Sequence, residues 1–261
     1  MSAAPQAARV FRQVGARGVY QDFGRRRALA GVDVTLRAGE AAVLLGDNGA
    51  GKSTLLSVLA TLLRPTRGRV LFDDHPAEAL EPAALRAALG VLAHEPRCYA
   101  DLSARENLRF FGRLYGLDSA QRSGAPSIDG QPLIDRAEAL LDRLSLRDAA
   151  DRPARTYSRG MLQRLAVART LLPRPGVLLL DEPYTGLDRG GVALLTTLLQ
   201  EEVAAGAIVL VISHDLEAVA PLCDRALLLR GGRLIADRHF DRGAATAAAL
   251  AALYSGGAQA A

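Results

Sequence analysis

Residues 46–54 read GDNGAGKST, and this stretch limits the possible folds more than any other part of the chain. The apolar run AAVLL (41–45) comes directly before it, and residues 53–63 follow with helical spacing up to Pro65. A strand, a glycine-rich loop and a helix in this order are the setting in which the pattern G-x-x-x-x-G-K-[ST] binds phosphate groups. An ordinary glycine turn is the weaker interpretation, because the fixed positions match by chance in on the order of one chain in a hundred of this length.

Lys52 is the only lysine of the chain, which otherwise uses arginine for its basic residues. Charge does not explain this, because arginine carries the same charge. Lysine offers a compact, strongly hydrated ammonium on a flexible stem, whereas arginine offers a planar fork. We therefore expect Lys52 to reach the β and γ phosphates of a nucleotide, and the hydroxyl of Ser53 to bind Mg²⁺. The predicted nucleotide-binding residues of this loop are Gly46, Asp47, Asn48, Gly49, Ala50, Gly51, Lys52, Ser53 and Thr54.

A second apolar run ends in two acidic residues, in the sequence VLLLDEP (177–183). A buried strand delivers Asp181 at its carboxyl end, where ligands bind in parallel sheets. Asp181 is predicted to hold Mg²⁺ through water, and Glu182 to orient and polarise an attacking water. Two solvated acids in a loop are the alternative, which the buried leucines disfavour. A Ras-like GTPase is excluded, because its N-K-x-D element needs a second lysine.

Strands that alternate with helices predict a parallel α/β sheet. Continuous apolar runs, such as residues 207–212, suit central strands that are covered on both faces. Short antiparallel strands are expected before residue 41, and a strand pair at 225–237. Residues 95–160 are expected to be a helical insertion, with a loop of turn-forming residues at 123–132.

Composition excludes some partners. The net charge is +4, but the arginines are spread along the chain and only 5% of the residues are aromatic. No basic stripe with stacking platforms is present, so nucleic acid is not an expected partner. Cys98 and Cys223 make no disulfide framework and suit a reducing compartment. The N-terminus lacks the apolar core of a signal peptide, and no apolar run approaches the ~20 residues of a membrane helix, so another chain would have to span a membrane.

Three further motifs follow in a fixed order: YSRGMLQR (157–164), TGLD (185–188) and SHD (213–215). With the two motifs above, they make the chain resemble the ATP-binding subunits of ABC transporters over nearly its whole length. The resemblance implies a P-loop α/β core with an N-terminal antiparallel β part and a helical subdomain. It places one ATP-binding domain at 1–243, with the helical subdomain at about 95–160, and an Ala-rich tail at 244–261.

The resemblance also assigns residues. YSRGM lies where the family has LSGGQ, so Ser158, Arg159 and Gly160 are expected at the nucleotide, with Arg159 and Met161 departing from the family pattern. Asp188 matches the D-loop aspartate and His214 the switch histidine. The aromatic residue on adenine is Phe23, with Tyr20 as the other candidate. The catalytic residues implied are Glu182, His214 and Lys52.

The family resemblance implies ATP and Mg²⁺ as cofactors and a head-to-tail pair of ATP-binding subunits. Each ATP then lies between the P-loop of one copy and Ser158–Gly160 of the other. A separate integral membrane subunit is the expected partner, which places this chain at the cytoplasmic face of the inner membrane. An ABC ATPase acting on DNA or ribosomes is less favoured, because the chain has no long coiled coil and no second ATP module.

His94 occupies the place of the family's usual glutamine and is an expected nucleotide-site residue. The surrounding sequence, AHEPRCYADLSARENLRFFGRLYGL, resembles the ATP-binding subunits of Ccm-type haem exporters of cytochrome c maturation. Export of another cargo, such as a drug, polysaccharide or lipid, is the alternative. A metal or haem site at His94 and Cys98 is disfavoured because no third ligand is evident. Residues 25–27, three arginines, are expected to form a solvated turn.

Overall fold

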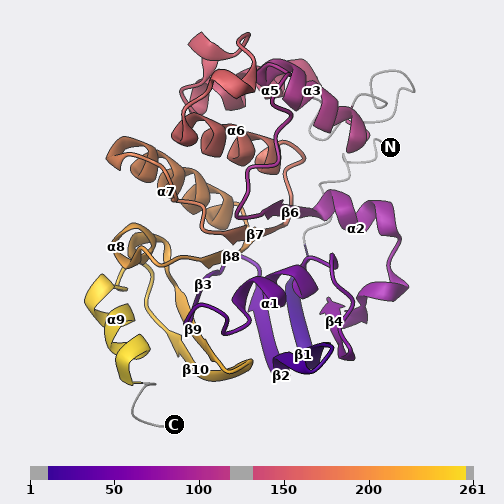
Figure 1. Cartoon of the computed structure of the whole chain (residues 1–261), viewed down its shortest axis with the longest axis vertical. Helices are drawn as coiled ribbons and strands as arrows, with labels where there is room; N and C mark the ends of the chain where they lie inside the picture. The colour runs from indigo at the N-terminus through magenta and orange to yellow at the C-terminus, as the bar shows by residue number, and fades with distance from the viewer. Residues whose placement is uncertain (1–10, 118–131, 257–261) are drawn as a thin grey trace, which may run out of the picture.

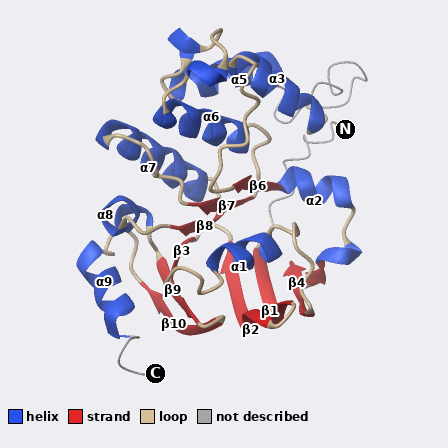
Figure 2. Cartoon of the chain, in the orientation of Figure 1, coloured by secondary structure: helices blue, strands red, loops and turns tan. Residues whose placement is uncertain are grey.

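A computed structural model describes residues 11–117 and 132–256, so the loop expected at 123–132 lies almost entirely outside the described residues. The larger sheet has the strand order β10-β9-β3-β8-β7-β6 (Figure 2). Five of its strands are parallel, and β10 pairs antiparallel with β9 at one edge. The strand bounds are Ala41–Leu45 (β3), Leu89–Leu92 (β6), Val177–Asp181 (β7), Ile208–Ile212 (β8), Arg225–Arg230 (β9) and Arg233–His239 (β10).

A second, four-stranded sheet is antiparallel and has the order β2-β1-β4-β5. Most of it precedes the phosphate-loop motif in the sequence, as expected. It forms a layer against the larger sheet beside α1 (Figure 1). Its strands are Gln13–Phe23 (β1), Arg26–Arg37 (β2), Arg67–Phe72 (β4) and His75–Pro76 (β5).

The central strands are buried on both faces, which confirms the interpretation of their continuous apolar runs. Along β3, Val43 belongs to one hydrophobic cluster and Leu44 to the other. The cluster around Val43 includes residues of α5, α6 and α7, and the cluster around Leu44 includes residues of α1, α2 and the antiparallel sheet. The helices are Lys52–Leu59 (α1), Pro82–Ala88 (α2), Ala104–Leu114 (α3), Leu133–Arg143 (α5), Arg159–Leu171 (α6), Arg189–Ala204 (α7), Leu216–Val219 (α8) and Ala247–Gly256 (α9).

Helix α1 is shorter than its apolar spacing predicted, because it ends at Leu59 rather than near residue 63. Ala60 caps the helix, and Thr61 then takes a left-handed φ of 57°. A β-branched residue in this conformation is strained and cannot continue a right-handed helix. The apolar residues that follow, including Leu62 at 67% exposure, therefore lie on the surface instead of in the helix.

The described chain between β6 and β7 is helix and loop, and it carries α3, α5 and α6. These helices group at one end of the molecule, next to α7 (Figure 1). No helix in residues 11–117 and 132–256 is both long enough and apolar enough to cross a membrane.

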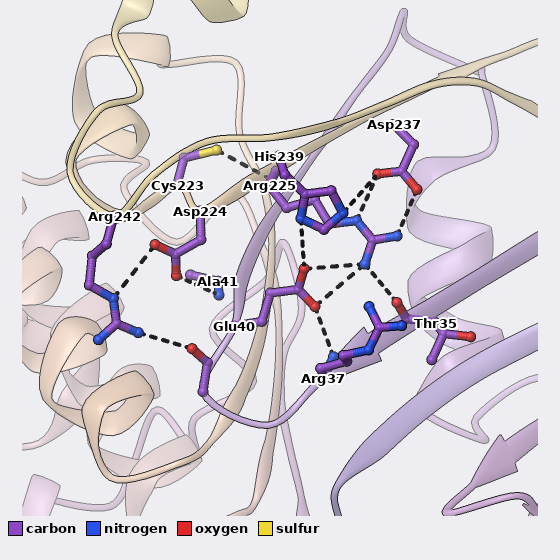
Figure 3. Close-up of polar contacts among 11 residues, drawn as sticks. Thr35, Arg37, Glu40, Ala41, Cys223, Asp224, Arg225, Asp237, His239 and Arg242 are labelled. Atoms are coloured by element: carbon purple, nitrogen blue, oxygen red, sulfur yellow. Dashed lines mark hydrogen bonds and ion pairs between the residues drawn. The ribbon is translucent and has the colours of Figure 1, made fainter.

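A buried arginine ties the base of β3 to the β9–β10 hairpin (Figure 3). Arg225, 5% exposed, donates two hydrogen bonds of 2.7 Å to Asp237 and one of 2.7 Å to the carbonyl oxygen of Thr35. Its Nη1 is also 3.2 Å from Glu40 Oε1. The guanidinium holds the pKa of Asp237 below its ordinary value. This network anchors the start of β3, whose other end carries the phosphate loop.

Candidate nucleotide-binding site

The glycine-rich loop joins the carboxyl end of β3 to the start of α1, as predicted. Two of its glycines are required by both conformation and space. Gly46 has a φ of +150°, and a Cβ at this position would lie 2.2 Å from the carbonyl oxygen of Leu229. Gly51 has a φ of +107°, and a Cβ at this position would lie 2.4 Å from the carbonyl oxygen of Ala28. Larger residues at either position would displace the backbone, so the loop keeps this conformation only with glycine.

Lys52 is the first residue of α1, and its side chain folds back over the loop. Its Nζ donates hydrogen bonds of 2.6 Å to Gly46 O and 3.0 Å to Asp47 O, and the residue is only 7% exposed. Burial lowers the pKa of Lys52, and the negative charges of Glu182 and Asp181 oppose that shift. The ammonium is thus enclosed by the turn of the loop, where a planar guanidinium needs more room.

Asp181 and Glu182 lie at the carboxyl end of β7. Asp181 is buried, and Glu182 has a left-handed φ of 53°. The backbone N–H of Glu182 donates a 2.9 Å hydrogen bond to Ile212 O, and Gln163 Nε2 donates one of 2.9 Å to Pro183 O. These two hydrogen bonds hold the strained turn at Glu182. Strain of this kind costs of order 1–3 kcal/mol and concentrates at functional sites.

The Glu182 carboxylate is set up as a proton acceptor. Its Oε1 is buried and has no hydrogen-bond partner among the described residues. Burial raises the pKa of Glu182, and His214 opposes that shift. The backbone N–H of His214 lies 3.4 Å from Glu182 Oε2, and His214 Nε2 lies 3.6 Å from Oε1. A carboxylate with a raised pKa and an unused oxygen is suited to take a proton from water.

A pocket of about 640 Å³ joins these groups. Most of the residues predicted from the sequence line it: Phe23, Asn48, Gly49, Gly51, Lys52, Ser53, Thr54, His94, Asp181, Glu182 and His214. Gly46, Asp47 and Ala50 belong to the loop but are not among its lining residues. The Ser53 hydroxyl and the Asp181 carboxylate are hard oxygen donors, so this end of the pocket fits Mg²⁺.

Phe23 and Tyr20 differ in where they lie. Phe23 lines the pocket and is 50% exposed. Tyr20 does not line the pocket. The Cζ of Arg27 lies 5.6 Å from the centroid of the Tyr20 ring, and the Tyr20 hydroxyl lies 2.8 Å from the point where a Cβ of Gly31 would be. Of the two aromatic candidates, Phe23 is therefore the one available to a base.

Arg26 also lines the pocket, although the sequence interpretation treated residues 25–27 as a solvated turn. Its Nη2 is 3.2 Å from the point where a Cβ of Gly49 would lie, so the guanidinium reaches the phosphate loop. Arg27 instead pairs with Asp22 at 2.8 Å. In the hairpin of β1 and β2, Phe23 pairs with Arg26, and this register brings both residues to the pocket. Sequence reasoning did not predict the register and therefore missed Arg26. Thr185 and Ile212 are further lining residues that sequence reasoning missed.

Apart from Thr185, the residues of the YSRGM and TGLD motifs lie outside the pocket lining and form a separate cluster. Ser158 caps the N-terminus of α6, and its Oγ accepts a 3.2 Å hydrogen bond from Met161 N. A Cβ on Gly160 would lie 2.8 Å from Gly186 O, and the Arg159 side chain packs on Gly186. Asp188 caps the N-terminus of α7, and its Oδ1 accepts a 2.7 Å hydrogen bond from Gly191 N.

His94 and Cys98 lie four positions apart and were weighed as a possible metal pair. Cys98 Sγ lies 3.5 Å from Pro96 O, and burial raises the pKa of its thiol to about 11. In the absence of a metal, a thiol at that pKa stays protonated near neutrality and is a poor nucleophile. The described residues contain no group of three or more histidine, cysteine, aspartate or glutamate side chains that could hold a metal ion.

Comparison with known families supports the interpretation of the pocket. The family model described as "ABC transporter" matches residues 29–185. The chain belongs to the ABC transporter family. This ABC protein binds and hydrolyses ATP, the chemistry of its family. The matched segment contains the glycine-rich loop, His94, the YSRGM motif, Asp181 and Glu182.

Curated relatives of this ABC subunit include transport ATPases of several kinds. A daunorubicin resistance ATP-binding protein of Streptomyces coeruleorubidus is 39% identical over 84% of this chain and 66% of its own length. ABC transporter ATP-binding protein NatA of Bacillus subtilis is 35% identical over 80% of each chain. A Nod factor export ATP-binding protein of Cupriavidus metallidurans is 35% identical over 85% of this chain and 69% of its own length. The chain thus spans about two thirds of the length of two of these relatives.

Solved structures confirm the expected ABC ATPase fold. The ATP-binding subunit of an ABC transporter superposes with a TM-score of 0.75 and 27% identity, over 87% of this chain and 90% of that chain. A dimeric ATP-binding cassette bound to ADP and Pi in a post-hydrolysis state gives a TM-score of 0.73 with 26% identity, over 87% and 99%. The expected subgroup is not supported: two of the relatives named above are a daunorubicin resistance and a Nod factor export protein, and none of the three is a Ccm-type haem exporter.

Proposed function

We propose that this chain is the ATP-hydrolysing subunit of an ABC transporter and powers export through a separate membrane subunit. The observation that carries the proposal is the meeting of Lys52, Asp181, Glu182 and His214 in one pocket at the carboxyl ends of β3, β7 and β8. These groups offer a cation for phosphate, oxygen ligands for Mg²⁺ and a base for water, which are the parts that phosphoryl transfer to water requires.

In this mechanism Lys52 exchanges its bonds to Gly46 O and Asp47 O for oxygens of the β and γ phosphates. Ser53 and Asp181 would hold Mg²⁺, which when bound neutralises phosphate charge. Glu182 orients the attacking water and takes its proton, while His214 fixes Glu182 through its backbone N–H. The stacking of Phe23 on adenine positions the other end of the nucleotide.

Two copies of the chain complete the site. Ser158, Gly160 and Asp188 lie outside the pocket lining of their own chain, so they are available to the nucleotide of a second copy. The N-terminus of α6 adds its dipole, which favours phosphate. ATP binding would close such a pair head to tail, and hydrolysis would release it.

A groove of about 600 Å³ beside the pocket suits the membrane subunit. It is lined by α1, by the segment after β6 and by α3, and it presents aromatic side chains, including Tyr99 at 50% exposure. Asp181 and Ala93 line it as well, so a partner bound there sits next to the Mg²⁺ ligand and His94. This partner would hold the chain at the cytoplasmic face of the membrane.

Two cargo classes are supported by different observations. The names of two relatives favour export of a drug such as daunorubicin or of a Nod factor, whereas the motifs around His94 favour haem. Inside-out vesicles that carry this chain with its membrane subunit separate them. We expect Mg-ATP-dependent uptake of daunorubicin in preference to haem. Uptake of haem alone would restore the Ccm-type assignment. If vesicles with ATPase activity take up neither compound, both cargo classes are rejected.

His94 gives a specific prediction. If it supplies one hydrogen-bonding nitrogen beside the γ-phosphate, glutamine offers a comparable polar group. His94→Gln should then keep most of the ATPase activity of the transporter complex, and His94→Ala should lose much of its stimulation by the membrane subunit with a smaller loss of ATP binding. Equal damage in both variants, together with a histidine-ligated haem spectrum in the wild type, would contradict this role.

Arg26 gives a second prediction, on nucleotide affinity. Its guanidinium lies over the loop and suits phosphate oxygens. We expect Arg26→Ala to weaken ATP binding about three- to tenfold, because exposed charged hydrogen bonds are screened. The matched control is Arg25→Ala, which removes the neighbouring charge outside the pocket lining. Isothermal titration at two salt concentrations measures both; equal losses would show a general charge effect and not a contact.

A further inference from the structure

The phosphate loop is held on its far side by the last part of the described chain. The turn between β9 and β10 contributes first: Gly232 N donates a 3.0 Å hydrogen bond to Ala50 O in the loop. Leu229 O lies against Gly46, so closely that no Cβ fits between them. These contacts are made by the backbone, and they leave the pocket side of the loop open.

Helix α9 contributes a side-chain contact to the same loop. Tyr254 donates a hydrogen bond from its hydroxyl to Asp47 Oδ1, across 207 positions of sequence. Arg230 joins both partners: its Nε lies 3.8 Å from Asp47 Oδ2, and its Nη2 lies 3.5 Å from Tyr254 O. The bond to Asp47 raises the pKa of Tyr254, so the phenol keeps the proton that it donates.

The helix that carries Tyr254 is fixed to the body of the protein. Leu250 is fully buried in the larger hydrophobic cluster, and Leu253 and Tyr254 pack against it. In the fold, α9 lies beside β9, where it also contacts α8 (Figure 1). Tyr254 therefore reaches the loop from an anchored element and not from a free chain end.

We infer that Tyr254 is a positioning residue for the phosphate loop, an inference that rests on the proposed nucleotide site. Asp47 is the link: its side chain is held by Tyr254 and Arg230, and its carbonyl oxygen accepts from Lys52 Nζ at 3.0 Å. A loop held in its binding shape before the ligand arrives loses less freedom on binding. The same coupling works in reverse, so a bound nucleotide stabilises the docking of α9.

The test compares Tyr254→Phe, which removes only the hydroxyl, with Ser255→Ala, its exposed neighbour on α9. In the full chain we expect Tyr254→Phe to raise KM for ATP about three- to tenfold, the effect of one lost hydrogen bond, with kcat nearly unchanged. Ser255→Ala should change neither. In wild type, saturating Mg-ATP should slow amide exchange in α9, and this protection should be lost in Tyr254→Phe.

The outcomes are separable. A wild-type chain that binds no ATP would reject the nucleotide site itself. A Tyr254→Phe variant with wild-type KM and wild-type protection of α9 would reject the positioning role while leaving the nucleotide site intact. A variant that melts earlier but keeps its KM would show that Tyr254 serves only to stabilise α9.

Discussion

Glu182→Gln should bind ATP and lose turnover by about 10²–10⁴-fold, the usual contribution of a positioned general base. The substitution keeps the size of the side chain and its hydrogen-bonding oxygen but removes the proton acceptor. Wild-type kcat should also fall on the acid side of its pH profile at a pH above the ordinary glutamate range, because burial raises the pKa of Glu182. Phosphate release measured from pH 5 to 9 tests both statements.

Retained binding is the control for this variant, and a fluorescent ATP analogue measures it. A variant that turns over at the wild-type rate would move the base to another residue. His214 is then the next candidate, because its ring lies 3.6 Å from Glu182 Oε1. His214→Ala in the same assay would separate the two, since only the true base should produce the acid limb of the profile.

Lys52→Arg should nearly abolish ATP hydrolysis although the charge is conserved. The Lys52 ammonium sits inside the turn of the loop, 2.6 Å from Gly46 O, in a residue that is only 7% exposed. The longer, planar guanidinium cannot enter without opening the loop. Removing one such contact to the transferring phosphate costs about 10²-fold or more, and a phosphate-release assay measures it.

The matched control is Arg25→Lys, which exchanges a guanidinium for an ammonium at a position outside the pocket lining. It should hydrolyse ATP at the wild-type rate. Wild-type activity in Lys52→Arg would show that charge alone suffices at this position. The presence of one lysine in an arginine-rich chain would then have no explanation in the shape of the loop.

Local patterns predicted the strand, loop and helix around residues 46–54 because each element has its own signal. AAVLL is apolar throughout, the glycines permit the tight turn, and the pattern ends in Lys52 and Ser53. The acidic end of β7 was predictable for a related reason, since a fully buried strand leaves polar residues only at its ends.

Contacts between distant segments were not predictable in this way. The role of Arg26 depends on the register of a hairpin, which pairs it with Phe23. The bond from Tyr254 to Asp47 depends on how α9 packs, and its Ala-rich sequence has no strong periodicity to show it. The early end of α1 depends on the backbone at Thr61, whereas the apolar spacing alone continued the helix.

Native mass spectrometry of the Glu182→Gln chain tests the central claim most directly, because the claim places each ATP between two copies of the protein. With Mg-ATP, we predict a species of two chains that holds two nucleotides, and single chains without nucleotide. Lys52→Arg under the same conditions should stay monomeric. A Glu182→Gln chain that saturates with one ATP and remains a monomer would contradict the composite site.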